Sequence, residues 1–107
     1  MSAPHRIRLR GPWESTSHAD GRAVHRRPFG KPTNLAANER IWLVIEGASP
    51  GAAVRLNGQA LGSAGHGEFA TDITAGLAAR NVLEVELTRA GESVGDVRLE
   101  IREQITL

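Results

Sequence analysis

The sequence contains no cysteine and no tyrosine, and its two tryptophans and two phenylalanines make up only 4% of the residues. Without cysteine there is no disulfide framework, no thiolate metal site and no cysteine nucleophile. The scarcity of aromatic rings argues against a stacking platform for single-stranded nucleic acid and against a carbohydrate platform built from many rings. No apolar run approaches the roughly 20 residues that a membrane-spanning helix needs. We therefore expect neither nucleic acid nor a membrane as a partner.

The length of 107 residues matches one ordinary domain, and we expect residues 1–107 to fold as a single unit. The first residues, Met-Ser-Ala-Pro-His-Arg, lack the apolar centre of a secretory signal. The expected location is therefore cytoplasmic by default.

Charge is distributed unevenly along the chain, whose net charge is +1. Residues 1–31 hold seven basic and two acidic side chains, a net charge of +5, and the remainder holds six basic and ten acidic ones, a net charge of −4. A basic block can attract a polyanion. However, its arginines alternate with Ile7, Leu9 and Val24, as the outward positions of strands do. We therefore favour a solvated strand face over nucleic-acid binding.

The strongest local signal is Asn57-Gly58, which lies between alternating apolar residues. A two-residue type I′ turn needs positive φ at both central positions, which Asn tolerates and Gly adopts freely. Val54 and Leu56 should face inward before this turn, and the chain should return through residues 60–61 into a glycine-rich loop over residues 62–67. The pattern predicts a β-hairpin.

Period-2 alternation recurs along the rest of the chain and predicts strands near residues 6–10, 23–27 and 41–46, with two more after residue 80. Residues 71–77 predict one turn of helix or 3₁₀ helix. The polar residues 14–22 are expected to form an exposed loop or ribbon. The expected fold is all-β, a two-layer antiparallel jelly-roll β-sandwich of about eight strands. Its core should come from Ile41, Leu43, Ile45, Val54, Leu56, Leu83, Val85, Leu87, Val97, Leu99 and Ile101.

The motifs follow one another in a recognisable order: an aromatic-aliphatic strand ending in Gly47, the Asn57-Gly58 hairpin, a glycine-rich loop, the turn Asp72-Ile73-Thr74 and the strand Asn81-Val82-Leu83-Glu84-Val85. This order resembles the galactose-binding-domain-like jelly roll, especially the sugar-binding domain of family 2 glycoside hydrolases. The resemblance covers roughly residues 24–101. Its motifs shape turns, so it implies a fold more strongly than a function. It also implies that catalysis is absent, because those hydrolases keep their catalytic acids in a separate barrel.

Residue types that carry chemistry are few. His18, Asp20 and His25 place three potential metal ligands within eight positions, but a fourth ligand is not evident and structural zinc takes four. We favour a solvated polar loop over a metal site. His66 lies alone in the glycine-rich loop, and no serine has the context of a nucleophile elbow. No catalytic residue, metal ion or cofactor is expected.

The two tryptophans differ in context, and a pyranose needs an exposed ring on which to stack. Trp42 lies within a continuous apolar strand, which favours a ring in the core or covering the sheet. Trp13 follows Gly11-Pro12 beside the polar loop, where exposure is easier to achieve than at Trp42, but we favour packing of its ring on the sandwich edge.

These observations predict a non-catalytic carbohydrate-binding-type module that holds a saccharide weakly through its loops. The candidate ligand-binding residues are Trp13, His18, Asp20 and His66. The alternative is a structural or protein–protein interaction module without a small-molecule ligand, which docks a sheet face or an edge strand on another protein or on a second copy. An enzyme is the least favoured class.

Overall fold

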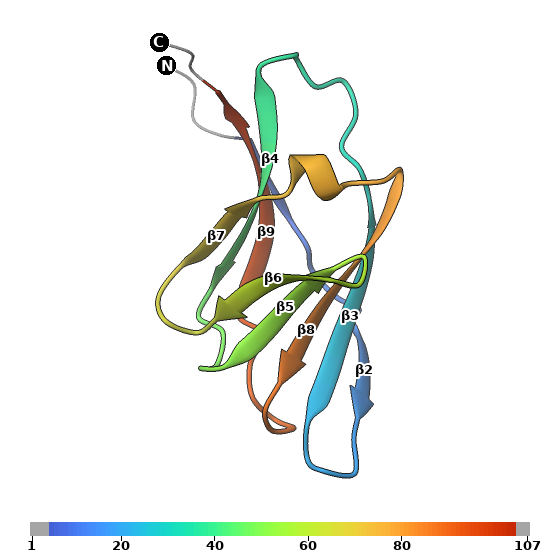
Figure 1. Cartoon of the computed structure of the whole chain (residues 1–107), viewed down its shortest axis with the longest axis vertical. Coiled ribbons are helices and arrows are strands. Elements are labelled where there is room, and N and C mark those ends of the chain that lie inside the picture. The colour runs from blue at the N-terminus through green and yellow to red at the C-terminus, as the bar shows by residue number, and fades with distance from the viewer. Residues whose placement is uncertain (1–4, 105–107) are drawn as a thin grey trace.

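The computed structural model describes residues 5–104, which form a sandwich of two antiparallel β-sheets (Figure 1). Sheet A contains, from edge to edge, β1 (His5–Arg8), β9 (Asp96–Glu103), β4 (Glu39–Glu46) and β7 (Phe69–Asp72). Sheet B contains β2 (Glu14–Ser17), β3 (Ala23–Gly30), β8 (Arg80–Leu87), β5 (Ala52–Leu56) and β6 (Gln59–Ala64). A 3₁₀ turn, η1 (Thr74–Gly76), joins β7 to β8. The predicted two-layer antiparallel sandwich is confirmed, with nine strands among residues 5–104 instead of about eight.

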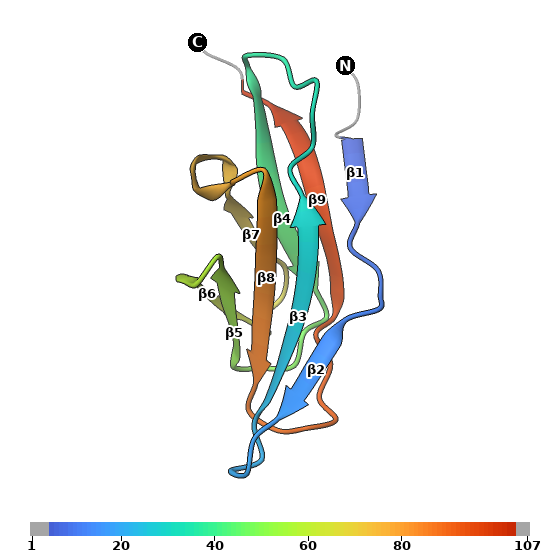
Figure 2. The same ribbon diagram turned by 90° about the vertical axis from the view of Figure 1, so that its right-hand side faces the viewer.

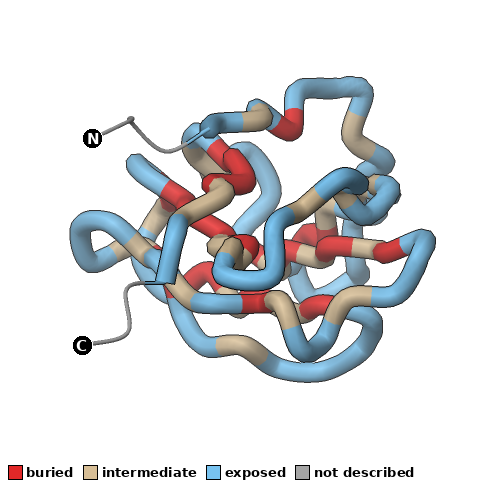
Figure 3. The backbone as a smooth tube through the Cα atoms, turned by 90° about the horizontal axis from the view of Figure 1, so that it is seen from above, coloured by how far each residue is buried: buried red, intermediate tan, exposed pale blue. Residues whose placement is uncertain are grey.

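Strand alternation turns one face of each sheet into the core, and the buried stretches lie toward the middle of the molecule (Figure 3). Ten of the eleven predicted core residues are buried, and the eleventh, Ile101, is half-buried opposite His5 on β1. Among residues 5–104 no helix is long and apolar enough to cross a membrane.

The predicted hairpin is confirmed. Leu56 pairs with Gln59, so the turn contains only Asn57 and Gly58, whose φ angles are 51° and 83°. These positive values at both positions are those of a type I′ turn. The side chain of Asn57 then ties the turn to β8, because its oxygen accepts a hydrogen bond of 2.9 Å from the amide of Val82.

Several strand boundaries differ from the sequence-based expectation: the first strand covers residues 5–8 instead of 6–10, and residues 14–17 of the expected loop or ribbon form β2. The predicted glycine-rich loop is shorter, because residues 62–64 belong to β6. A register shift in the pairing of β5 with β6 accommodates Gly62, whose φ is 144°. The third strand is longer than predicted and continues through Pro28 to Gly30. Proline is tolerated there because β2 pairs only with residues 23–26, so that within the described part of the chain no strand pairs with Pro28 on that side (Figure 2).

The loop between β4 and β5 is held closely by two other loops. A Cβ atom on Gly95, in the β8–β9 loop, would lie 2.3 Å from the carbonyl oxygen of Glu46. A Cβ atom on Gly65, in the β6–β7 loop, would lie 2.5 Å from the carbonyl oxygen of Ser49. Both distances are far below van der Waals contact, so only glycine fits at these two positions.

Candidate functional site

The structure places Trp13 at an edge of the sandwich, in the connection between β1 and β2. Its ring is half-buried and packs against the core, and its indole nitrogen donates a hydrogen bond of 3.2 Å to the carbonyl oxygen of Leu9. Trp13 therefore packs on the sandwich edge, as the sequence favoured.

His18 and Asp20 lie together in the exposed turn of the β2–β3 hairpin. Asp20 accepts hydrogen bonds from the backbone amide and the guanidinium of Arg22, at 3.1 and 2.7 Å. The backbone hydrogen bond is the main cause that lowers the pKa of Asp20, and the guanidinium adds to it. This carboxylate is thus already used to close its own turn.

A shallow pocket of about 290 Å³ beside His18 lies on the outer face of sheet B. Its charged lining residues pair with each other: Arg26 lies 3.4 Å from Glu84, and Arg55 lies 3.6 Å from Glu86. These ion pairs connect neighbouring strands, so the opposite charges that line the pocket balance each other. Within residues 5–104 no three His, Asp or Glu side chains are grouped so that they could hold a metal ion.

His66 is exposed in the loop between β6 and β7, which are edge strands of the two sheets. Trp13 connects β1 and β2, which are the opposite edge strands of the same sheets. The width of the sandwich therefore separates these two candidates, so they do not contribute to one site.

A different set of side chains forms a pocket on the outer face of sheet A, the face turned away from sheet B. Trp42 lines it, because alternation on β4 sends Ile41 and Leu43 into the core and Trp42 outward. Asp72 on β7 and Glu100 on β9 are its direct neighbours across the sheet. The pocket has a volume of about 480 Å³ and is lined by Arg40, Trp42, Asp72, Arg102, Glu103 and Gln104.

Arg102 holds one face of the Trp42 ring. Its guanidinium carbon lies 4.5 Å from the ring centroid, in a cation–π arrangement. Two of its nitrogens donate to one carboxylate oxygen of Glu100, at 3.0 and 2.8 Å. The ring and the guanidinium are therefore fixed relative to each other.

Arg40 is oriented from the other side of the pocket by Asp72. The Nε atom of Arg40 donates to Asp72 Oδ2 at 2.8 Å, while Asp72 Oδ1 accepts from the amide and hydroxyl of Thr74 at 3.0 and 2.7 Å. Burial acts to raise the pKa of Asp72, but the hydrogen bonds from Arg40 and Thr74 outweigh it and lower the pKa. Asp72 thus positions Arg40 and accepts two hydrogen bonds from Thr74, the first residue of η1.

An ion network extends from Glu100 along this face of sheet A. The side chains of Arg98 and Glu100 are only 9% and 5% exposed and are joined at 2.8 Å. Arg98 also reaches Glu46 at 2.6 Å, and Arg6 on β1 reaches Glu100 at 3.4 Å. Burial acts to raise the pKa of Glu100, yet the hydrogen bonds from Arg98 and Arg102 keep it below its ordinary value.

Sequence reasoning missed the Trp42 pocket. It treated Trp42 as a ring in the core or covering the sheet, and the ring does cover the sheet, but it remains half-buried at the wall of a pocket. The available signal was the alternation of Arg40 and Trp42 with inward apolar residues, which puts both outward on one strand. The partners Asp72 and Arg102 come from strands whose register the sequence does not state.

Two further hollows adjoin each other at the far end of β3 and β8. One has a volume of about 580 Å³ and is lined by Phe29, Arg80, the buried Asn81 and four residues with apolar or no side chains. The other, of about 460 Å³, lies beside Lys31 and Leu35. Neither brings an aromatic ring together with several oriented polar side chains, so the Trp42 pocket is the stronger candidate.

No family model and no curated protein matches the chain. Solved structures do match its fold. It is similar to a β-D-glucuronidase from Dictyoglomus thermophilum (TM-score 0.80, 13% identity, 96% of this chain and 29% of that one) and to a β-glucuronidase from Bifidobacterium dentium (TM-score 0.78, 17% identity, 96% and 31%). It is also similar to a β-glycosidase from Bacteroides vulgatus (TM-score 0.64, 23% identity, 78% and 12%). The chain thus spans between about an eighth and a third of the length of these glycoside hydrolases.

Proposed function

We propose that the chain is a non-catalytic carbohydrate-binding module of the galactose-binding-like jelly-roll type, and that its saccharide lies in the Trp42 pocket. The observation that carries the proposal is the pocket itself, in which a half-buried indole ring is surrounded by hydrogen-bonding side chains in fixed positions. The fold shared with parts of glycoside hydrolase chains supports the carbohydrate class.

The chemistry of the pocket suits a sugar ring. The C–H groups of a pyranose pack on an aromatic face, while its hydroxyls need partners in the ring plane. Arg40 and Arg102 supply donors, and the Gln104 amide can both donate and accept. The pocket is open and shallow, so we expect weak binding, with dissociation constants on the order of 1 mM.

The same groups are poorly suited to glycoside hydrolysis, which takes a protonated acid and a second carboxylate on either side of the scissile bond. Asp72 also lines the pocket, but its lowered pKa and its hydrogen bonds from Arg40 and Thr74 keep it ionised, so it cannot donate a proton. This supports a binding role without catalysis.

Trp42→Ala tests the proposal. A glycan-array screen of the chain identifies saccharides, and NMR titration of the ¹⁵N-labelled protein then measures their affinity. We expect binding to be abolished in Trp42→Ala and retained in His66→Ala, since His66 lies on a different part of the molecule. A melting curve for each variant controls for folding. Loss of binding in His66→Ala with retention in Trp42→Ala would move the site to the β6–β7 loop and contradict the proposal.

The second candidate is a structural or interaction module without a small-molecule ligand. The observation that favours it is the limited span of the match, because in the matched hydrolases the corresponding region is one part of a much longer chain. If no saccharide on the array binds and light scattering shows a dimer or a complex, this second function replaces the first.

A further inference from the structure

We propose that the saccharide bound at Trp42 is an acidic one, a hexuronic acid or a chain of them, whose ring carboxylate is held between Arg40 and Arg102. This inference rests on the proposed function and names the class of sugar. It follows from the way in which the sheet brings these two arginines together.

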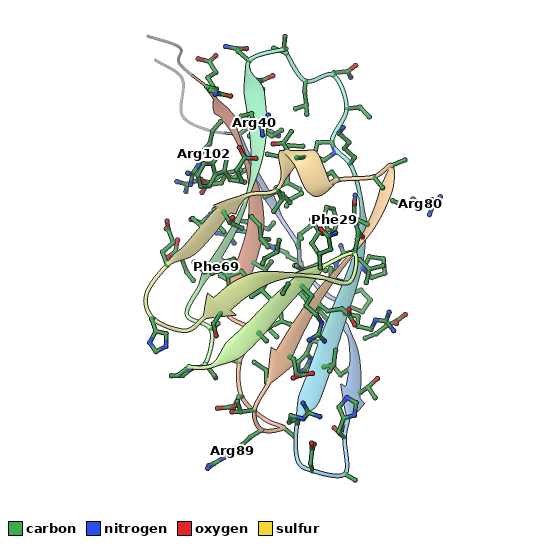
Figure 4. The ribbon with its side chains drawn as sticks, in the orientation of Figure 1. Phe29, Arg40, Phe69, Arg80, Arg89 and Arg102 are labelled. Atoms are coloured by element: carbon green, nitrogen blue, oxygen red, sulfur yellow. The ribbon has the colours of Figure 1, made fainter. Side chains whose placement is uncertain are left out.

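Arg40 on β4 and Arg102 on β9 are paired residues in the register of sheet A, so both side chains leave the same face at directly opposed positions. Figure 4 shows them next to each other at one end of the sheet. Like charges directly opposite each other in a sheet are destabilising. An anion bound between the two guanidinium groups would convert that repulsion into two attractive contacts.

Each arginine is oriented by its own carboxylate and keeps donors in reserve. Arg40 uses its Nε atom on Asp72, and among residues 5–104 its two terminal nitrogens make no hydrogen bond. Arg102 uses Nε and one terminal nitrogen on Glu100, and its Nη1 atom makes no hydrogen bond within the same described residues. Guanidinium groups fixed in this way are suited to carboxylates, which accept two parallel N–H bonds.

Two acidic side chains also line the pocket, but they do not reverse its preference for an anionic ligand. Asp72 is occupied by Arg40 and Thr74, so its charge is compensated where it stands. Glu103 is exposed, and it pairs in register with Glu39, outside the arginine pair. Within the arginine pair itself, the hydrogen-bonding groups left unused by residues 5–104 are cationic donors.

The position of Trp42 selects a sugar acid over a simple anion. Trp42 is two residues from Arg40 on the same face, and Arg102 lies over its ring. In a hexuronic acid the carboxylate is attached directly to the pyranose ring. A ring packed beside the indole would therefore carry its carboxylate to the arginine pair without a flexible spacer.

The test is an NMR titration of the full chain with three probes: galacturonic acid, galactose, and acetate as a carboxylate without a sugar ring. We expect galacturonic acid to bind about tenfold more tightly than galactose or acetate, a difference of about 1.4 kcal/mol in binding free energy. Added salt should weaken the binding of galacturonic acid, because salt screens the attraction between its carboxylate and the arginines. Arg40→Gln and Arg102→Gln should each remove this preference. Arg89→Gln makes the same charge change at the opposite end of the molecule (Figure 4) and should leave it unchanged.

Each outcome decides a separate point. Equal affinity for galactose and galacturonic acid at Trp42 would overturn the acidic-sugar inference and leave the carbohydrate function standing. Acetate binding as tightly as the sugar acid would show an anion site that does not recognise the ring, and would also overturn it. No shift around Trp42 with any probe would remove both proposals. Arg40→Lys keeps the charge but not the planar fork, and should reduce the preference only in part, which separates recognition from loss of folding.

Discussion

Asn57 and Asn81 join three segments of the chain through their side-chain amides. Asn81 is 2% exposed, and its oxygen accepts from the amide of Ala78 at 2.8 Å and from Asn57 at 3.0 Å. The Asn57 side chain also donates to the carbonyl oxygen of Gly76, so the hairpin turn, η1 and the start of β8 share one network. Buried amides are tolerated only when their hydrogen bonds are made, and here they are.

Gly58→Val tests the conformation of this turn. Gly58 has φ 83°, and nothing lies within 4 Å of where its Cβ would be, so the substitution adds backbone strain without a clash. We expect a loss of about 1–3 kcal/mol in the free energy of unfolding, measured by urea denaturation. Gly30→Val is the control, because Gly30 lies in a strand with nothing closer than 3.9 Å to its Cβ. Equal effects of the two substitutions would contradict a strained type I′ turn.

Residues whose role is local could be predicted from the sequence, and residues whose role depends on distant partners could not. Asn57-Gly58 fixes its own turn, and the inward alternation of the strands identified the core. The burial of Arg98, in contrast, depends on Glu46 of β4 as well as on Glu100, two residues along its own strand. The exposure of Trp42 depends in the same way on β7 and β9. Register between distant strands decides both, and the local pattern does not contain it.

At the level of elements, three loops meet at one end of the sandwich. The β4–β5 loop lies between the β6–β7 loop and the β8–β9 loop, with Gly65 and Gly95 as the points of closest approach. The backbone of Ser49 adds a hydrogen bond to this contact, because its amide donates to the carbonyl oxygen of Ser93 at 2.9 Å. The connection that carries the chain from sheet A to sheet B is thus fixed by backbone packing.

Gly95→Ala and Gly91→Ala form a matched pair that tests this packing. Both glycines lie in the β8–β9 loop with similar φ, 81° and 91°, but only at Gly95 does a Cβ meet the backbone. We expect Gly91→Ala to cost about 1 kcal/mol from positive φ alone, and Gly95→Ala to cost roughly 1–3 kcal/mol more. Chemical denaturation measures both. Indistinguishable midpoints would show that the loops can move apart freely.

Across the whole molecule, basic side chains of the N-terminal residues lie beside acidic side chains from the rest of the chain. The first 31 residues carry a net charge of +5 and the remainder −4. Their side chains pair over long sequence distances: Arg6 with Glu100, Arg22 with Glu86, and Arg26 with Glu84. The pairs of Arg22 and Arg26 are largely exposed and contribute little to stability. The three pairs engage three of the seven basic side chains in residues 1–31.

The buried member of this network predicts acid sensitivity. Because the pKa of Glu100 is lowered in the folded state, its contribution to stability is present above the unfolded pKa, about 4.3, and is lost as pH falls through the folded value. Asp72 acts in the same direction. We expect the melting temperature to fall between pH 5 and pH 3.

Glu100→Gln isolates the contribution of this carboxylate. The variant should be less stable than the parent by about 2 kcal/mol at pH 7, because Arg98 and Arg102 lose a charged acceptor, and the difference should disappear toward pH 3. Glu103→Gln, at the exposed end of β9, serves as the control. A constant difference at all pH values would show that the carboxylate charge is not responsible.

We expect Pro28 to limit the aggregation of the protein at high concentration. It lies where β2 no longer covers β3, on a stretch whose backbone could otherwise pair with the strand of another molecule. Proline has no N–H to donate, and its carbonyl oxygen already accepts a hydrogen bond from the guanidinium of Arg27. Pro28→Val would restore a donor at this uncovered edge. We expect that variant to form sheet-rich aggregates, detected by light scattering, under conditions where the parent stays dispersed.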